Sequence, residues 1–321
     1  MAEWYAADGL SCRRRRSRAS GTHAGPQLIA ITMGETLINL VLSGLSTGGL
    51  YAVIALGFSL VAGVMRLLNL AHGEILVGSV FLMLALMNML HLDPFIAMLG
   101  ALPIVFVIAY VVQRTLLQQL LSHSAESLLV ATFGLSIAGQ AIFQLVFGPN
   151  AVSLDSMLGF TGVDVLGHTM RWISVVAIVF GVGLTTLTYL LLTYTTFGKS
   201  LRAAAEDVLA AQSLGVDVRH VFALCLGLGA VLTACGAVIV GIGFSVSPTS
   251  GMLWLIRAVT VVVIGGMGSV WGTLFAAILV GVAEEVGVLT FGPAYRDLVV
   301  FSILILVLVI RPSGLFAKEL R

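Results

Sequence analysis

Long apolar segments alternate with short polar connections along most of the chain. Each is about 16 to 27 residues long, which suits helices that cross a bilayer and is too long for barrel strands. A helix also pairs its own backbone groups, as lipid requires. The pattern predicts an all-α, polytopic membrane protein of eight or nine transmembrane helices, at about 37–63, 75–90, 95–112, 128–147, 172–193, 221–244, 272–290 and 297–310, with a shorter element at 254–268.

A polar insert, defined here as residues 199–220, separates two of these segments. Its small and apolar residues recur at helical spacing, and Gly215 offers a C-terminal stop because it enters the left-handed conformation at little cost. We therefore expect one short amphipathic helix outside the bilayer, where a soluble partner can bind it. The residues on its apolar face are Leu201, Ala204, Ala205, Val208 and Ala211.

Composition supports lipid as the main solvent. The 321 residues are 59% hydrophobic and 10% charged, with a mean hydropathy of +1.09, whereas soluble domains carry about a quarter charged residues. A net charge of +1 argues against nucleic acid as a partner. Cys12, Cys225 and Cys235 form neither a disulfide framework nor a metal-ligand spacing, so no metal site is expected.

Residues 1–32 differ from the rest. Five arginines between Arg13 and Arg18 precede a polar stretch without periodicity, which predicts a disordered basic leader or a mis-assigned start, with Met33 as the true one. The alternative is a basic tail that contacts anionic lipid.

Basic residues in the connections predict the orientation. If the polar insert is cytoplasmic, that side holds eight basic residues and the opposite side holds three, as the positive-inside rule requires. The same orientation would place the arginine-rich leader outside, a second reason to doubt it. The eight are Arg66, Arg114, Lys199, Arg202, Arg219, Arg311, Lys318 and Arg321, and the three are Arg171, Arg257 and Arg296.

Glycine spacing predicts close helix contacts. Gly44 and Gly48, and likewise Gly268 and Gly272, have the four-residue separation that lets helix backbones approach in lipid. The cluster Gly265-Gly-Met-Gly268 is too dense for a helix interior and predicts a bend or a half-helix near a membrane face.

The run Asn69-Leu-Ala-His72-Gly73-Glu74 lies between two apolar segments. Asn69, Gly73 and Glu74 face protein, water or a cavity, because lipid exposure would be costly. One interpretation is a helix break that lines a transport path, to which Asn69, His72 and Glu74 offer polar contacts. The other is a cytoplasmic turn among lipid headgroups.

Glu284 and Glu285 interrupt an otherwise apolar segment. They point about 100° apart on a helix, so at most one can face a narrow pore. Glu284 is a candidate for the substrate path, because an acid inside a membrane is often functional. The alternative is that the pair reaches the outer membrane interface.

Catalytic signatures are missing. Gly198-Lys199-Ser200 resembles the end of a phosphate-binding loop, but Thr193 stands where its first glycine is required. No nucleophile elbow, zinc-protease motif or paired C-x-x-C occurs. We therefore expect no catalytic residue in this chain.

Several motifs together resemble one family. Asn69–Glu74 is similar to the N-L-A-H-G-E signature of the permeases of branched-chain amino acid ATP-binding-cassette importers, and 196–218 resembles their cytoplasmic coupling segment. Gly265–Thr273 and Arg311–Phe316 match two further stretches, and the order agrees across 34–317, with LivH-type subunits most similar.

This resemblance implies a multi-pass inner-membrane permease domain at 33–317, with a cytoplasmic coupling loop at 194–220 and a cytoplasmic tail at 318–321. It implies Arg202, Glu206, Ala211 and Gly215 as ATPase-coupling residues. The implied partners are a second, LivM-type permease, two cytoplasmic ATPases that bind ATP and Mg²⁺, an extracytoplasmic solute-binding protein and membrane lipid. This chain itself would bind no cofactor.

Branched-chain amino acids are the implied substrates, with urea, amides and other small amino acids left open. The rival interpretation is a stand-alone, ion-coupled secondary transporter or a channel. It would explain an intramembrane acid but gives no reason for the charged polar insert.

Overall fold

The computed structural model describes residues 26–65, 68–120, 125–156, 159, 161–165 and 168–310. The chain divides into two units, residues 1–38 and 39–321, and the described part of the first unit is the start of a helix. That helix begins at Pro26, within the range predicted for the leader. Arg13–Arg18, Arg66, Arg311–Phe316 and the tail lie outside the described residues.

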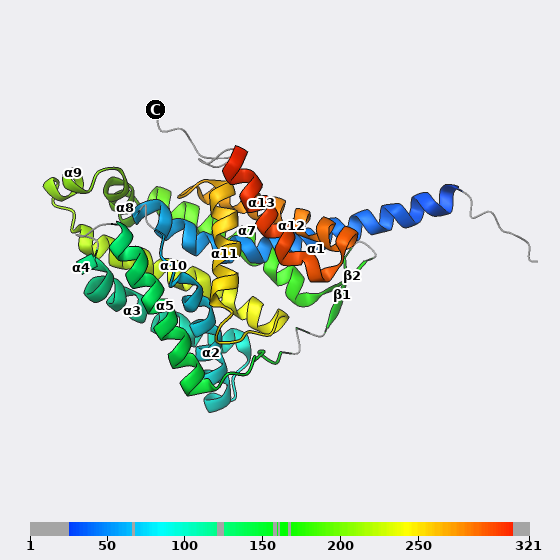
Figure 1. The fold of residues 1–321 in the computed structure, drawn as a ribbon, viewed down its shortest axis with the longest axis horizontal. Coiled ribbons are helices and arrows are strands. Elements are labelled where there is room, and N and C mark those ends of the chain that lie inside the picture. The colour runs from blue at the N-terminus through cyan, green and yellow to red at the C-terminus, as the bar shows by residue number, and fades with distance from the viewer. Residues whose placement is uncertain are drawn as a thin grey trace, which may run out of the picture. The chain divides into compact units, whose positions relative to one another are not determined.

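Helices make up most of the described chain, as the apolar pattern predicts (Figure 1). One antiparallel hairpin, with Gly162 opposite Arg171, was not predicted. The elements in order are α1 Pro26–Met65, α2 His72–Leu90, α3 Pro94–Val112, π-helix η1 Gln113–Leu117, α4 Gln118–Leu120, α5 Ala125–Phe147, β1 Gly162–Val165, β2 His168–Arg171, α7 Trp172–Tyr194, α8 Thr196–Glu206, α9 Val208–Ser213, α10 Val218–Gly243, α11 Gly251–Gly265, α12 Val270–Phe291, η2 Pro293–Tyr295 and α13 Arg296–Ile310.

Eight stretches of the described chain are helical, apolar and long enough to cross a membrane. They confirm the predicted segments to within a few residues at most ends; the third runs on through η1 and α4. The short helix α11 corresponds to the predicted element at 254–268. The eight are Thr36–Met65, His72–Leu90, Pro94–Leu120, Glu126–Phe147, Trp172–Tyr194, Val218–Gly243, Val270–Phe291 and Pro293–Ile310.

Burial differs sharply between these helices. In α1 and α10, 83% of the most apolar 18-residue window is buried inside the protein, whereas in α5 and in the span containing α13 the share is 11%. An apolar helix with so little internal contact presents its side chains to lipid or to another subunit. Helices α1 and α10 therefore belong to the core of the bundle, and α5 and α13 to its outside.

Glycines bring α1 and α12 together, as their spacing predicts. A Cβ on Gly48 would lie 2.7 Å from the Cα of Ile278, and one on Gly281 would lie 2.5 Å from the carbonyl oxygen of Gly44. Only hydrogen fits at these positions. The backbones of α1 and α12 are thus in direct contact over a full turn.

Glycines also allow close contact between α1 and two other helices. A Cβ on Gly49 would lie 2.6 Å from the Ala177 carbonyl oxygen of α7, and one on Gly229 of α10 would lie 2.8 Å from the Gly57 carbonyl oxygen. Helix α1 is therefore in close backbone contact with α7, α10 and α12.

The glycine cluster after α11 forms the predicted bend. Gly266 and Gly268 both have φ of +81°, a conformation that favours glycine. Ser269 then caps α12, because its hydroxyl accepts a hydrogen bond from the Gly272 amide at 3.2 Å. The chain can thus reverse direction between α11 and α12 within a few residues.

The polar insert and the β-hairpin lie at opposite ends of the bundle (Figure 1). Helix α7 begins directly after β2 and ends directly before α8, and α10 begins after α9 and returns. They contain 23 and 26 residues, or about 35 and 39 Å at 1.5 Å per residue. Both helices therefore connect the insert directly to the hairpin end.

Candidate functional site

The polar insert forms two short helices instead of the predicted one. Asp207 has φ −149° and ψ 111°, which ends α8. Its carboxylate accepts hydrogen bonds from the amides of Leu209 at 2.8 Å and Ala210 at 3.0 Å, and so starts α9. Aspartate is a favoured N-cap, and this local capping outcompetes a continuous helix.

Gly215 follows the end of α9, the second helix of the polar insert, and provides the predicted stop. Its φ is +84°, and its amide donates a hydrogen bond to the Gln212 carbonyl at 2.9 Å. The Val216 amide bonds the Ala211 carbonyl at 3.1 Å. These bonds pair carbonyls that a helix end would otherwise leave open.

The insert presents apolar side chains outward. Leu209 and Leu214 are 74% and 83% exposed, and Arg202 and Glu206 are exposed as well. Ala211 is only 1% exposed and faces the protein. Of the four predicted coupling residues, Arg202, Glu206 and Gly215 can thus touch a partner directly, whereas Ala211 supports the loop from within.

Helix α8 is firmly held by the bundle. Leu201 and Ala204 are buried, and Gly198 packs its Cα against the carbonyl of Leu192 near the end of α7. The Thr195 hydroxyl accepts a hydrogen bond from the Gly198 amide at 3.1 Å. Helix α8 is therefore packed directly against the end of α7.

In the predicted Asn69–Glu74 motif, Asn69 shapes the start of α2. Its side-chain oxygen accepts a hydrogen bond from the Ala71 amide at 3.0 Å, and its carbonyl accepts one from the His72 amide at 3.2 Å. Asn69 is 7% exposed and borders a mainly apolar cavity. The motif is therefore a buried helix start and not a turn among headgroups.

His72 links α2 to α10. Its Nε2 lies 2.9 Å from the Thr233 hydroxyl, which itself donates to the Gly229 carbonyl. Phe58 stands edge-on to the imidazole, with 5.3 Å between ring centroids. His72 is fully buried, and its hydrogen bond with Thr233 joins α2 to α10.

Glu74 lies where α2, α5 and α11 meet. Its Oε1 accepts hydrogen bonds from Ser136 at 3.0 Å and Gln140 at 2.9 Å, and its carboxylate packs against Gly251, the first residue of α11. Gly73 packs against the Gly251 carbonyl. Two helix N-termini thus converge on one carboxylate, which their dipoles favour.

Beside Glu74 is a cavity of about 370 Å³. Asn69 and Glu74 supply polar groups, and most of the remaining wall is apolar, including Ile75, Leu82 and Phe143. This combination can hold an aliphatic group next to a carboxylate. The structure thus brings Asn69 and Glu74 to one cavity.

Glu284 is enclosed in a buried polar cluster. The Tyr51 hydroxyl donates a hydrogen bond to its Oε2 at 2.6 Å, and the Arg296 Nε lies 3.2 Å from its Oε1. The Glu284 side chain has no solvent exposure. Arg257, which the charge pattern counts on the side opposite the insert, lies within α11, where it pairs with Asp297.

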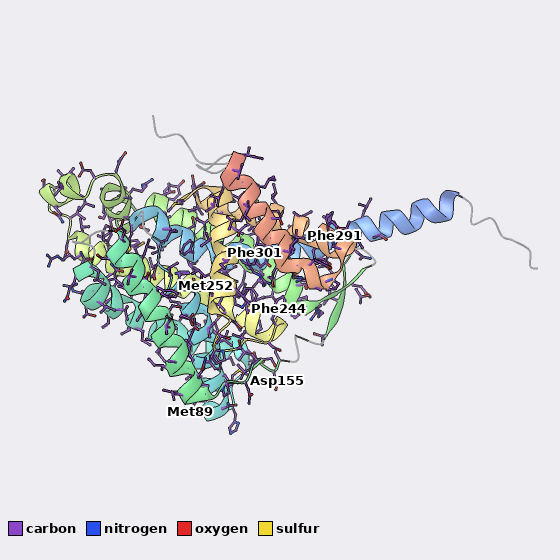
Figure 2. The ribbon with its side chains drawn as sticks, viewed as in Figure 1. Met89, Asp155, Phe244, Met252, Phe291 and Phe301 are labelled. Carbon is purple, nitrogen blue, oxygen red and sulfur yellow. The ribbon has the colours of Figure 1, made fainter. Side chains whose placement is uncertain are left out.

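Glu285 faces a different environment, which we name the hairpin-end cavity. It measures about 360 Å³ and is bordered by three charged residues, Arg171, Glu285 and Arg296, and by the hydroxyls of Ser43, Ser46, Thr47 and Ser174. The Glu285 Oε1 accepts a hydrogen bond from Thr47 at 3.2 Å and pairs with Arg296 at 3.3 Å. The apolar wall includes Phe244, labelled in Figure 2 at the end of α10.

The structure encloses Glu284, the acid predicted for the substrate path, in the core and brings its neighbour Glu285 to this cavity. Arg171 and Arg296, which the sequence analysis used only to predict the orientation, border the same cavity. The signal for Arg296 was its position eleven residues after Glu285, across a turn with Gly292 and Pro293. Within the described ranges, no group of three or more His, Cys, Asp or Glu side chains could hold a metal ion.

Together, membrane-length helices, a charged insert at one end and a charged cavity at the other define an integral membrane transport protein. The family model described as "Branched-chain amino acid transport system / permease component" matches residues 40–308. The chain belongs to this family of transport permeases.

Named relatives agree over nearly the full length. The chain is 32% identical over 296 residues to the high-affinity branched-chain amino acid transport system permease protein BraD of Pseudomonas aeruginosa, covering 87% of this chain and 95% of that one. It is 30% identical to LivH of Escherichia coli, covering 86% and 94%, and 24% identical to a probable LivH of Methanocaldococcus jannaschii, covering 90% and 95%. No solved structure matched.

Proposed function

We propose that the chain is the permease subunit of an ATP-binding-cassette importer that moves branched-chain amino acids, or related small amino acids and amides, across the inner membrane. The observation that carries this is the polar insert: an ordered pair of short helices that joins α7 to α10 and exposes Leu209 and Leu214. Exposed leucines on a capped loop outside the apolar bundle suit a soluble protein's groove.

The energy source lies outside this chain in the proposal. Two cytoplasmic ATPases would bind ATP and Mg²⁺, and a solute-binding protein would deliver the substrate on the far side. A second permease would complete the path, which agrees with the large apolar surface left on α5 and α13. The insert and C-terminus would be cytoplasmic, the orientation that the basic residues favour.

Transmission follows from the way α8 is held. Closure of the ATPases would shift the insert as a rigid body, because Gly198 and Leu201 fix α8 to the bundle. The shift would pass into α7 and α10, which reach the hairpin end. Arg202, Glu206 and Gly215 would contact the ATPase, and Ala211 would hold the loop's shape.

For the substrate path, we propose that Asn69 and Glu74 line it through their cavity, with Gly73 allowing α11 to approach. His72 and Glu284 would stabilise the helices around the path, since each forms a hydrogen bond to another helix inside the core. The ion pair to Arg296 weighs against Glu284 as a proton carrier.

The test is reconstitution of the permease with its ATPases, partner permease and binding protein in proteoliposomes. Leucine uptake should require ATP on the ATPase side of the membrane and no ion gradient. The Leu209→Asp variant should lose ATPase association, whereas Leu209→Met should keep it. Uptake driven by a proton or sodium gradient without ATP would overturn the proposal in favour of a secondary transporter.

A further inference from the structure

We propose that the hairpin-end cavity binds the ammonium and carboxylate groups of a zwitterionic amino acid. This inference rests on the proposed function and adds a binding site to it. The cavity lies at the opposite end of α7 and α10 from the polar insert, so a substrate would meet it before any contact with the insert end.

Arg171 provides the group for the carboxylate. It borders the cavity at the junction of β2 and α7, and its guanidinium has no ion-pair or hydrogen-bond partner among the described residues. A guanidinium can bind a carboxylate through two parallel hydrogen bonds. The hydroxyl of Ser174, in the first turn of α7, borders the same cavity.

Glu285 provides the group for the ammonium. Its Oε1 is already held by Thr47 and Arg296, which fix the carboxylate in place. Its Oε2 has no hydrogen bond within the part of the chain that the structure describes. That oxygen can accept a hydrogen bond from an ammonium group.

Charge balance favours a zwitterion over a simple ion. The two guanidinium groups, Arg171 and Arg296, are matched by two carboxylates, Glu285 at the cavity and its neighbour Glu284, which pairs with Arg296. A ligand with one charge of each sign leaves this balance intact. A cationic or anionic analogue would disturb this balance, because one of the charged groups at the cavity would then face no opposite charge on the ligand.

The size of the cavity and the apolar part of its wall agree with an aliphatic amino acid. The volume of about 360 Å³ lies within the range of roughly 300–1,000 Å³ usual for small-molecule sites. Leu50, Ile173 and Phe244 form an apolar part of the wall, beside the charged groups. An aliphatic side chain could contact this part while the charged groups hold its other end.

The experiment measures binding of labelled leucine to the assembled, detergent-solubilised transporter without its binding protein, by equilibrium dialysis. Arg171→Gln should weaken binding about tenfold or more, the factor for one lost charge-assisted hydrogen bond. Arg171→Lys should retain part of the affinity. The control Asp164→Asn, which removes an exposed charge from β1 outside the cavity, should bind like the unmodified protein.

Analogues test the charge argument directly. Leucine should displace the label far better than leucinamide, which lacks the carboxylate, or 4-methylpentanoate, which lacks the ammonium. A cysteine at position 174 (Ser174→Cys) should be protected from a thiol reagent by leucine and not by either analogue. This readout needs no loss-of-binding variant. The natural Cys225 and Cys235 are buried, and Cys12 is replaced by serine (Cys12→Ser) so that the reagent reports on position 174.

Equal binding by Arg171→Gln and the unmodified protein, equal displacement by the analogues, or no leucine binding at all would overturn the inference. ATP-driven leucine uptake by the unmodified transporter is measured in parallel. If that uptake occurs and the cavity tests fail, only the binding site is wrong. If ATP-driven uptake is absent for leucine and for the related amino acids and amides alike, the proposed function is wrong.

Discussion

The Tyr51 hydroxyl of α1 donates a 2.6 Å hydrogen bond to Glu284 of α12, 233 residues further along the chain. Arg296 of α13 contacts the other carboxylate oxygen at 3.2 Å. Three helices thus meet at one buried acid. Glu284, an acid within an apolar segment, joins three helices in the fold, because a buried charge must be paired.

Tyr51→Phe should destabilise the bundle by about 1–3 kcal/mol, because it leaves the buried Glu284 Oε2 without a donor. The measurement is the thermal unfolding midpoint in detergent. Tyr194→Phe is the matched control, since Tyr194 is 74% exposed. Equal midpoints for the two variants would show that the hydrogen bond contributes nothing to stability.

Gly281→Ala should destabilise by about 1–3 kcal/mol, because its Cβ would lie 2.5 Å from the Gly44 carbonyl oxygen and force α1 and α12 apart. Gly183→Ala on α7 is the control: a Cβ there meets nothing within 4 Å, and the change should be neutral or slightly stabilising. Unfolding midpoints in detergent again decide. If both substitutions have the same effect, the α1–α12 contact is looser than described.

Gly215→Val should reduce transport while ATP hydrolysis continues. A β-branched residue at φ +84° costs about 1–2 kcal/mol of backbone strain and would distort the end of the polar insert. The measurement is the ratio of leucine transported to ATP hydrolysed in proteoliposomes. Ala210→Val, at an exposed helical position of the same insert, should keep the ratio. Normal transport by Gly215→Val would contradict the lever role.

Cysteine labelling should reveal the side of the membrane on which the insert lies. In a chain whose Cys12 is replaced (Cys12→Ser), Leu209→Cys should react with a membrane-impermeant maleimide in inside-out vesicles and not in intact cells, because Leu209 is 74% exposed on the proposed cytoplasmic side. Asp164→Cys on the hairpin should show the reverse. Ala211 is unsuitable for this purpose because it is 1% exposed. Reaction of Leu209→Cys in intact cells would invert the proposed orientation.

The predicted helices were confirmed because each membrane helix is largely specified locally. An apolar run of sufficient length pairs its own backbone groups, and lipid offers no alternative. The same holds for Gly215, whose left-handed conformation depends on the glycine itself. The break at Asp207 is also determined locally, by the capping side chain. It was not predicted because the helical spacing of apolar residues continues across it from Leu201 to Ala211.

The polar sites depended on partners far away in sequence. Glu284 and Glu285 are neighbours on α12, yet one is sealed by Tyr51 and the other borders a cavity with Arg171. Likewise, the sequence around Glu74 does not indicate that its carboxylate contacts Ser136, Gln140 and Gly251. Contacts between residues so far apart in the sequence leave no periodic pattern from which they could be predicted.

The sequence by itself determined the membrane helices, the glycine contacts, the bend after α11 and the polar insert, because these follow from local hydrophobicity and backbone freedom. Only the tertiary structure decided which charged groups share a cavity and which are sealed in the core. That choice is made by the packing of α1, α7, α12 and α13 against one another, where backbone approach at glycine sets the distance between side chains.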